Sequence, residues 1–100
     1  MNDDQVESLL TEFKARMSIY HSSEDAELKN MLQGSYDAVN RMTGVSDITN
    51  NQFKELVIER TRYVYNDQAE FFEDNFLSTI IGLSLQAYGK ETSDDEPTDL

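Results

Sequence analysis

One stretch of this sequence, residues 53–88, reads FKELVIERTRYVYNDQAEFFEDNFLSTIIGLSLQAY. It contains four of the chain's five phenylalanines and three of its five tyrosines. Apolar residues recur with the period of an α-helix in its first half, and the period resumes after the polar break Asn66–Asp67. The recurring positions are Phe53, Leu56, Val57, Arg60 and Val64, and then Phe72, Phe76, Ile80, Leu83 and Ala87. The stretch therefore predicts two helices.

A second apolar row lies beside the first in the later helix. It consists of Leu77, Ile81, Leu85 and Tyr88. A helix that is apolar over much of its circumference is covered on more than one side. We therefore expect this helix to be covered by the rest of its own chain or by a neighbouring molecule.

Two more helices are predicted upstream of this stretch. The first spans residues 3–20, where Asn2 and the acids after it suit a positive helix N-terminus. Its apolar stripe consists of Val6, Leu9, Leu10, Phe13, Met17 and Tyr20. The second begins after Ser22 or Ser23 and ends at Gly44, which suits a left-handed C-terminal position. Residues 49–51, Thr-Asn-Asn, offer caps for the third helix, which reaches about Tyr65.

The C-terminal residues 90–100, KETSDDEPTDL, contain five acids, one apolar residue and the only proline. Such a segment cannot bury enough apolar surface to offset its ordering entropy, so it is predicted to be disordered. Gly89 is the expected C-terminal cap of the last helix. The predicted fold class is all-α: a bundle of three to four helices in residues 1–89, followed by a flexible acidic tail in residues 90–100.

The formal net charge is −12 in 100 residues, and residues 71–100 carry −6 of it, from seven acids and one lysine. Binding to nucleic acid through a basic patch is not expected, because phosphate contacts need clustered Lys and Arg. There is no cysteine, no secretory signal at the N-terminus and no apolar run of membrane-spanning length. A soluble protein made in a cytoplasm, with no membrane partner, is therefore expected.

Catalytic chemistry is poorly represented in the sequence. His21 is the only histidine, and it lacks the partners of a catalytic triad or a metal site. Asp25 and the pair Glu73–Asp74 read as solvated charges, and no EF-hand, phosphate-binding loop or dinucleotide-binding motif occurs. The sequence therefore predicts no catalytic residue, no metal, no cofactor and no enzyme.

Arg60 falls on the apolar stripe of the third helix and is followed closely by two tyrosines. A buried arginine is costly unless it is paired, and Arg and Tyr are enriched at interface cores. Two interpretations stay open: a subunit or partner interface, or an arginine that reaches a surface acid while both tyrosines pack internally. The candidate interface residues are Arg60, Arg62, Tyr63, Tyr65, Phe72 and Phe76.

The order of these parts resembles the small head–tail connector proteins of tailed bacteriophages, the head-completion or adaptor family. Residues 28–44 supply a long helix and its glycine turn, and residues 59–66, ERTRYVYN, supply the middle signature. Residues 70–76, EFFEDNF, and the aliphatic run 77–85 supply the last part. The similarity covers roughly residues 5–88, and the acidic tail lies outside it.

The resemblance implies a structural virion protein at the junction of capsid and tail, made in the bacterial host cytoplasm. Members of that family form a closed ring, a dodecamer by resemblance, below the portal protein. The ring extends the DNA channel and provides the docking surface for a stopper or tail-completion protein, while DNA passes without sequence-specific binding. The tail acids Glu91, Asp94, Asp95, Glu96 and Asp99 are candidate contacts to the portal.

Two alternatives belong to other classes of function. The net charge is compatible with a small acidic inhibitor that mimics DNA and blocks a DNA-binding enzyme. Such a mimic needs carboxylates spaced like phosphates along a folded face, whereas half of this excess charge lies in one segment. A subunit that supplies only structure to an enzyme is the other alternative.

Overall fold

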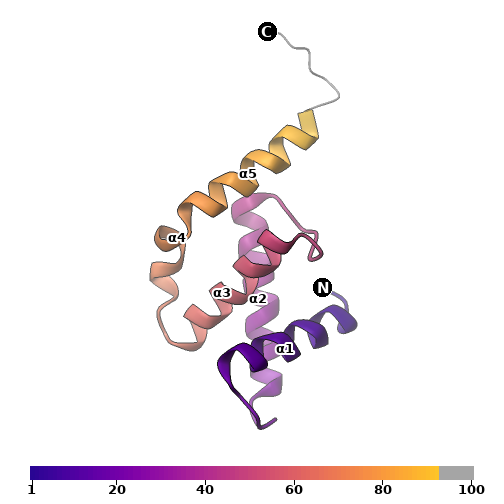
Figure 1. Ribbon diagram of the computed structural model, residues 1–100, viewed down its shortest axis with the longest axis vertical. Coiled ribbons are helices and arrows are strands. Elements are labelled where there is room, and N and C mark those ends of the chain that lie inside the picture. The colour runs from indigo at the N-terminus through magenta and orange to yellow at the C-terminus, as the bar shows by residue number, and fades with distance from the viewer. Residues whose placement is uncertain (93–100) are drawn as a thin grey trace.

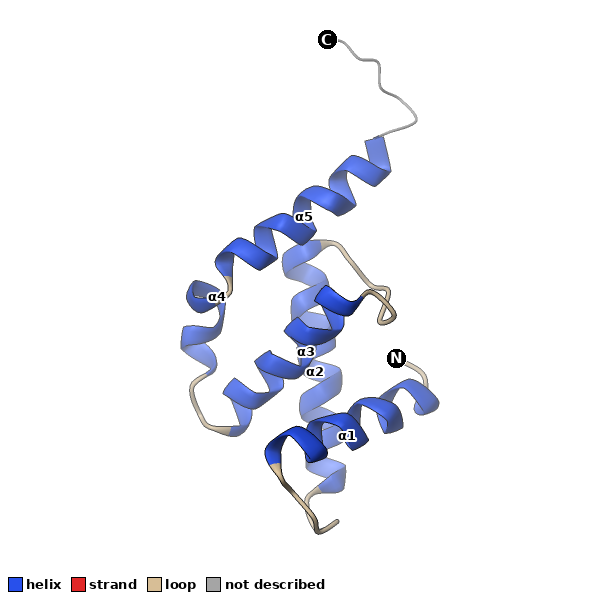
Figure 2. Ribbon diagram, in the orientation of Figure 1, coloured by secondary structure: helices blue, strands red, loops and turns tan. Residues whose placement is uncertain are grey.

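The computed structural model describes the backbone of residues 1–92 and the side chains of residues 1–89. Helices joined by short connections make up this part of the chain, and it contains no strand (Figure 1, Figure 2). The all-α prediction is confirmed. The helices are α1 (Asp3–Met17), α2 (Asp25–Thr43), α3 (Asn51–Tyr65), the 3-10 helix η1 (Ala69–Phe71), α4 (Phe72–Asn75) and α5 (Leu77–Thr92).

Helix α2 is the centre of the bundle, because α1, α3 and α5 all pack against it. In Figure 1 it runs behind α1 and α3, and α5 crosses near its C-terminal end. The interior is made by one face of each long helix, as the apolar periods predict. The core residues are Leu9, Leu10, Phe13, Leu28, Leu32, Val39, Phe53, Leu56, Val57, Ile58, Phe72, Ile80 and Leu83.

Helix α1 begins at a reciprocal capping box. The Asn2 side chain accepts a hydrogen bond from the Gln5 backbone N–H (2.8 Å), and the Gln5 side chain accepts one from the Asn2 N–H (3.0 Å). The helix ends at Met17, because Ser18 takes a left-handed conformation with φ 58°. Tyr20 therefore lies beyond the helix and is 88% exposed, so its predicted place on the buried stripe is wrong.

Helix α2 ends where predicted, at Gly44 with φ 77°. Its start differs from the prediction: Glu24 holds the N-cap position without a side-chain hydrogen bond, and Ser22 and Ser23 precede it. A hydrogen bond from α2 holds the connection to α3: the Tyr36 hydroxyl donates to the Ser46 carbonyl (2.7 Å). Asn50 then caps α3 by accepting from the Phe53 N–H (3.1 Å), as predicted.

The chain turns from α3 towards α5 at Asp67, whose φ is 60°. Aromatic rings hold this corner: Phe72 and Phe76 stack with centroids 5.0 Å apart, and Tyr63 of α3 meets each of them edge-on at 5.8 Å. The helical period over residues 72–88 predicts one helix, but Phe76 interrupts it with φ −117° and ψ 20°. The corner therefore bends the predicted fourth helix into α4 and α5.

Helix α5 continues through Gly89 to Thr92. Gly89 is therefore not the C-terminal cap that its residue type suggests. Figure 1 shows α5 leaving the α4 corner and extending past the end of α2. Residues 93–100, most of the predicted tail, lie outside the described residues.

An ion-pair network joins α1 to α3. Arg16 makes two hydrogen bonds to the Glu55 carboxylate, at 2.8 and 3.0 Å, and lies 3.5 Å from Glu59 and 3.6 Å from Glu12. Lys54 of α3 reaches back to Glu12 at 3.3 Å. These contacts raise the pKa of the Arg16 guanidinium, mainly through the hydrogen bond to Glu55. The bidentate geometry fixes how α1 lies along α3.

Replacement of a core phenylalanine tests the packing. Phe53 is fully buried against Tyr36, at a centroid distance of 5.4 Å, whereas Phe71 is 52% exposed. We expect Phe53→Ala to lower the free energy of unfolding by about 3–5 kcal/mol, through lost burial and the cavity that remains. Phe71→Ala is the matched control and should change it by less than about 0.5 kcal/mol. Equal losses in urea unfolding would show that Phe71 is also a core residue.

Acid should weaken the link between α1 and α3. The hydrogen bond from Arg16 lowers the pKa of Glu55, against an opposing effect of burial. A lowered carboxyl pKa contributes stability that is present above the ordinary value and is lost as pH falls through the lowered one. We expect Arg16→Gln to be less stable than the wild type at neutral pH by no more than about 1 kcal/mol, because the pair is exposed. This difference should shrink in acid, and a constant difference would contradict the linkage.

Candidate functional site

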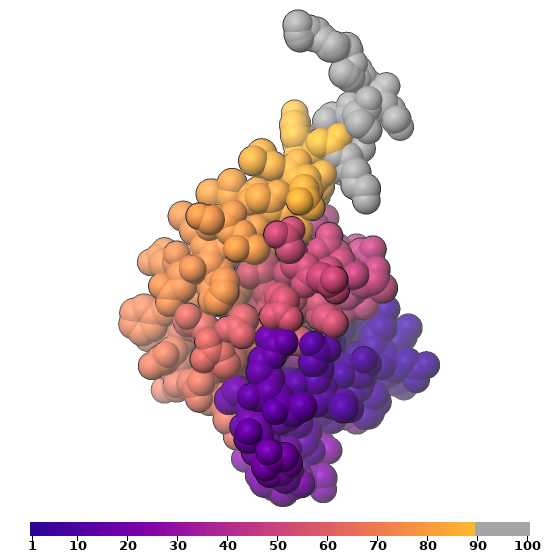
Figure 3. Space-filling view, viewed as in Figure 1, coloured from indigo at the N-terminus to yellow at the C-terminus, as the bar shows by residue number. Residues whose placement is uncertain are grey.

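The main exposed apolar feature of the described residues is one face of α5. Leu77, Ile81, Leu85 and Tyr88 are 48%, 49%, 64% and 65% exposed. We call these four residues the α5 row. The opposite face of the same helix buries Ile80 and Leu83 against the body. In Figure 3, α5 forms the orange-to-yellow ridge at one end of the molecule. The second apolar row, which the sequence predicts to be covered, is thus largely exposed in the described part of the chain.

The segment that carries the α5 row has no charged residue. Residues 76–89, FLSTIIGLSLQAYG, contain no Asp, Glu, Lys or Arg, although 28% of the whole chain is charged. Gly82 is exposed in this segment, and a Cβ added there would meet nothing within 4 Å. Packing inside the described chain therefore does not require this glycine. It leaves the helix backbone open to close approach from outside.

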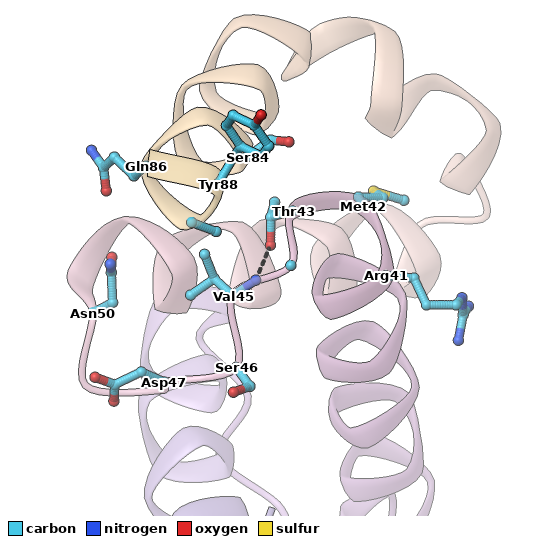
Figure 4. A pocket seen from close by; sticks show the side chains of 12 residues that line it. Arg41, Met42, Thr43, Val45, Ser46, Asp47, Asn50, Ser84, Gln86 and Tyr88 are labelled. Atoms are coloured by element: carbon cyan, nitrogen blue, oxygen red, sulfur yellow. Dashed lines mark hydrogen bonds between the residues drawn. The ribbon is translucent and has the colours of Figure 1, made fainter. Parts of the chain in front are cut away.

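A groove of about 710 Å³ lies between α5 and the connection from α2 to α3. Figure 4 shows Asn50 and Asp47 on the connecting loop, Gln86 and Tyr88 on α5, and Val45 between them. The loop is fixed, because the Val45 N–H donates to the Thr43 hydroxyl (3.1 Å), drawn as the dashed line. Both polar and apolar side chains line this open groove, so it suits a contact with a protein segment better than a catalytic pocket.

Arg60 contacts a hydroxyl of its own chain instead of the surface acid that one of the two interpretations predicts. Its Nη1 donates to the hydroxyl of Ser35, 3.2 Å away on α2, and it forms no ion pair with a described residue. Burial lowers the pKa of Arg60, and the positive charge of Arg41 lowers it further. The predicted surface acid is therefore absent from this site in the described part of the chain. Sequence reasoning did not single out Arg41, because only the packing of α2 against α3 brings the two arginines together.

The neighbours of Arg60 in sequence are engaged within the subunit. Arg62 donates to Glu59 (3.1 and 2.8 Å), and its guanidinium lies 5.4 Å from the centre of the Tyr63 ring. The Tyr65 hydroxyl donates to Glu24 (3.0 Å), which raises the pKa of Tyr65. Both tyrosines pack internally, as one of the two interpretations predicts.

The two phenylalanines among the predicted interface residues belong to the α3–α5 corner. Phe72 is 1% exposed, so it is a core residue and presents no surface to a partner in this fold. Phe76 is partly buried and lines a second groove of about 440 Å³ between α3 and α5, together with Leu56 and Thr79. The side chains of Glu91, Asp94, Asp95, Glu96 and Asp99 lie outside the described residues.

No three His, Asp or Glu side chains among the described residues are placed to hold a metal ion. The Nδ1 of His21 lies 2.8 Å from the Ser23 hydroxyl in an exposed turn, and Asp25 pairs with Lys14 at 2.6 Å. No helix within the described range is long and apolar enough to cross a membrane.

Comparisons of the chain with protein-family models, curated proteins and solved structures find no match. These comparisons assign no family to the chain.

Proposed function

We propose that this chain is the subunit of a ring-shaped head–tail connector, which assembles below the portal protein of a tailed bacteriophage. One observation carries the proposal: the α5 row is exposed along a helix that has no charge between residues 76 and 89. Contiguous apolar surface of this kind marks an interaction site in a soluble protein. The ring extends the DNA channel and provides the docking surface for a stopper or tail-completion protein.

The charge of the chain favours another copy as the molecule that covers the α5 row. Two copies that each carry −12 repel one another over most of their surfaces. The repulsion is weakest where a surface has no charge, and there burial of apolar area adds attraction. The α5 row meets both conditions. A contact between the α5 row of one copy and a different face of the next is heterologous, and repetition of such a contact closes a ring.

The pattern of ion pairs gives less support to a DNA mimic. Five acids, Glu7, Glu12, Asp25, Glu55 and Glu59, already bind Lys or Arg side chains of the same chain. Carboxylates neutralised in this way do not act as a row of phosphate-like charges. A structural role in an assembly agrees better with a surface that combines internal ion pairs and one uncharged helix.

A single charge in the α5 row tests the proposal. Leu85→Asp removes the apolar contact of one side chain, worth about 1.5–3 kcal/mol when it is buried, and places an acid in its position. We expect ring formation on the portal, measured by light scattering and electron microscopy, to weaken at least about tenfold. Melting of the isolated subunit should barely change, because Leu85 is 64% exposed.

The matched control is Asn30→Asp, which adds the same charge to an exposed residue of α2, outside the row and outside both grooves. Assembly of this variant should remain close to that of the wild type. If both variants assemble equally well, the α5 row is not the interface. If the wild type stays monomeric at high concentration and beside the portal, the connector proposal is wrong.

Removal of part of the acidic C-terminal segment tests whether this segment contacts the portal. We expect removal of residues 93–100, which leaves α5 complete, to preserve helix content and melting temperature but to weaken binding to the portal. Neutralising Asp94, Asp95, Glu96 and Asp99 to their amides gives the matched control for charge. If charge dominates, the neutral variant and raised salt both reproduce the deletion. Portal binding that is unchanged after the deletion would exclude this segment as the contact.

A further inference from the structure

Two positive side chains among residues 1–89 form no ion pair with a described residue, although the chain is strongly acidic. Residues 1–89 contain seven Lys and Arg side chains, and five of them form ion pairs with acids of the same subunit. The other two, Arg41 and Arg60, form no ion pair with a described residue. We call them the arginine pair. Asp37, one turn before Arg41 on α2, accepts a hydrogen bond from Gln33 (3.1 Å) and forms no ion pair with a described residue.

The arginine pair lies where α2 packs against α3. Arg60 is half-buried and is held by its hydrogen bond to Ser35, which is fully buried. Arg41, in the last turn of α2, is exposed, and Figure 4 shows its side chain projecting from α2 away from Asn50 and Gln86. A guanidinium has five N–H donors, and the contact with Ser35 satisfies only one of those of Arg60. Free N–H donors of guanidinium groups on two neighbouring helices suit a carboxylate ligand.

Acids without a positive partner occur at another place on the same subunit. Glu70, Glu73 and Asp74 of η1 and α4 are exposed, and none of them forms an ion pair with a described residue. Phe71, which lies among them, is 52% exposed. We call these four residues the acidic corner. An exposed aromatic ring beside unpaired carboxylates is complementary to a pair of arginines, through ion pairs and a cation–π contact.

We propose that the arginine pair of one copy binds the carboxylates of the acidic corner of the next copy in the ring. This inference rests on the proposed function. The two surfaces differ and lie at different places on the subunit, as a heterologous contact requires. The ion pairs set the register of neighbouring copies, and the α5 row supplies the apolar area. Like charges also disfavour a contact between the arginine pairs of two copies or between their acidic corners.

Charge reversal on each side tests the contact. Arg41→Glu and Glu73→Arg each place like charges across the joint, and each should weaken ring assembly at least about tenfold. An equimolar mixture of the two variants should assemble again, because alternating copies restore an opposite-charge contact at every joint. The matched control Glu27→Arg makes the same charge change at an exposed acid of α2 that has no ion pair, and it should assemble like the wild type.

Circular dichroism melting of each variant separates assembly from folding. If Arg41→Glu melts at a lower temperature, the neutral Arg41→Gln replaces it and should also weaken assembly. Assembly that is unaffected by Arg41→Glu, or a mixture that fails to recover, overturns this inference. If this inference is overturned but Leu85→Asp still prevents assembly, the proposed function stands without the inference. A wild type that never assembles overturns both this inference and the proposed function. If Arg41→Glu assembles normally but loses binding to duplex DNA, the arginine pair is a phosphate site instead.

Discussion

The structure depends on the aromatic corner where α3 meets α5. Tyr63 contacts both Phe72 and Phe76 edge-on at 5.8 Å, and the Asn75 amide donates to the Tyr63 hydroxyl (3.0 Å). These contacts fix the direction in which α5 leaves the corner. Because the direction is fixed, Ile80 and Leu83 meet the body while the α5 row faces outwards. A straight continuation of α4 would present a different face of α5, so the exposure of the row follows from the corner.

Electrostatics and burial divide the molecule into two kinds of surface. The acidic helices neutralise part of their own charge through pairs such as Arg16–Glu55 and Lys29–Glu7, which also hold α1 against α3 and α2. The segment 76–89, which includes most of α5, has no charged residue and therefore forms no ion pair. Electrostatic repulsion between two such chains is therefore weakest along α5.

Much of the fold could be predicted from the sequence, because local rules decide it. The caps at Asn2, Gly44 and Asn50 mark helix ends, and the apolar periods select the buried faces. The missed features depend on tertiary contacts. At Phe76, which Tyr63 of α3 contacts, the chain interrupts a helix that periodicity predicts to be continuous. Helix α5 also continues through Gly89, a residue that commonly ends helices.

The site was predicted less completely for the same reason. The second apolar row of α5 is visible in the sequence, and its exposure agrees with cover by a neighbour. Arg60 stands out in the sequence as a charge on an apolar stripe, but its partner Ser35 and its neighbour Arg41 come from another helix. Periodicity identifies the face of a helix and not the residues it meets. Phe72 illustrates the limit, because an aromatic residue typical of interfaces is here a core residue.

The central claim is that copies of this chain cover the α5 row of their neighbours. Electron cryomicroscopy of the protein bound to its portal tests it most directly, because helices become visible in each copy. We predict a closed ring in which the outward face of every α5, from Leu77 to Tyr88, lies against the adjacent subunit. A ring in which that face is exposed to solvent, or single copies scattered on the portal, would contradict the account.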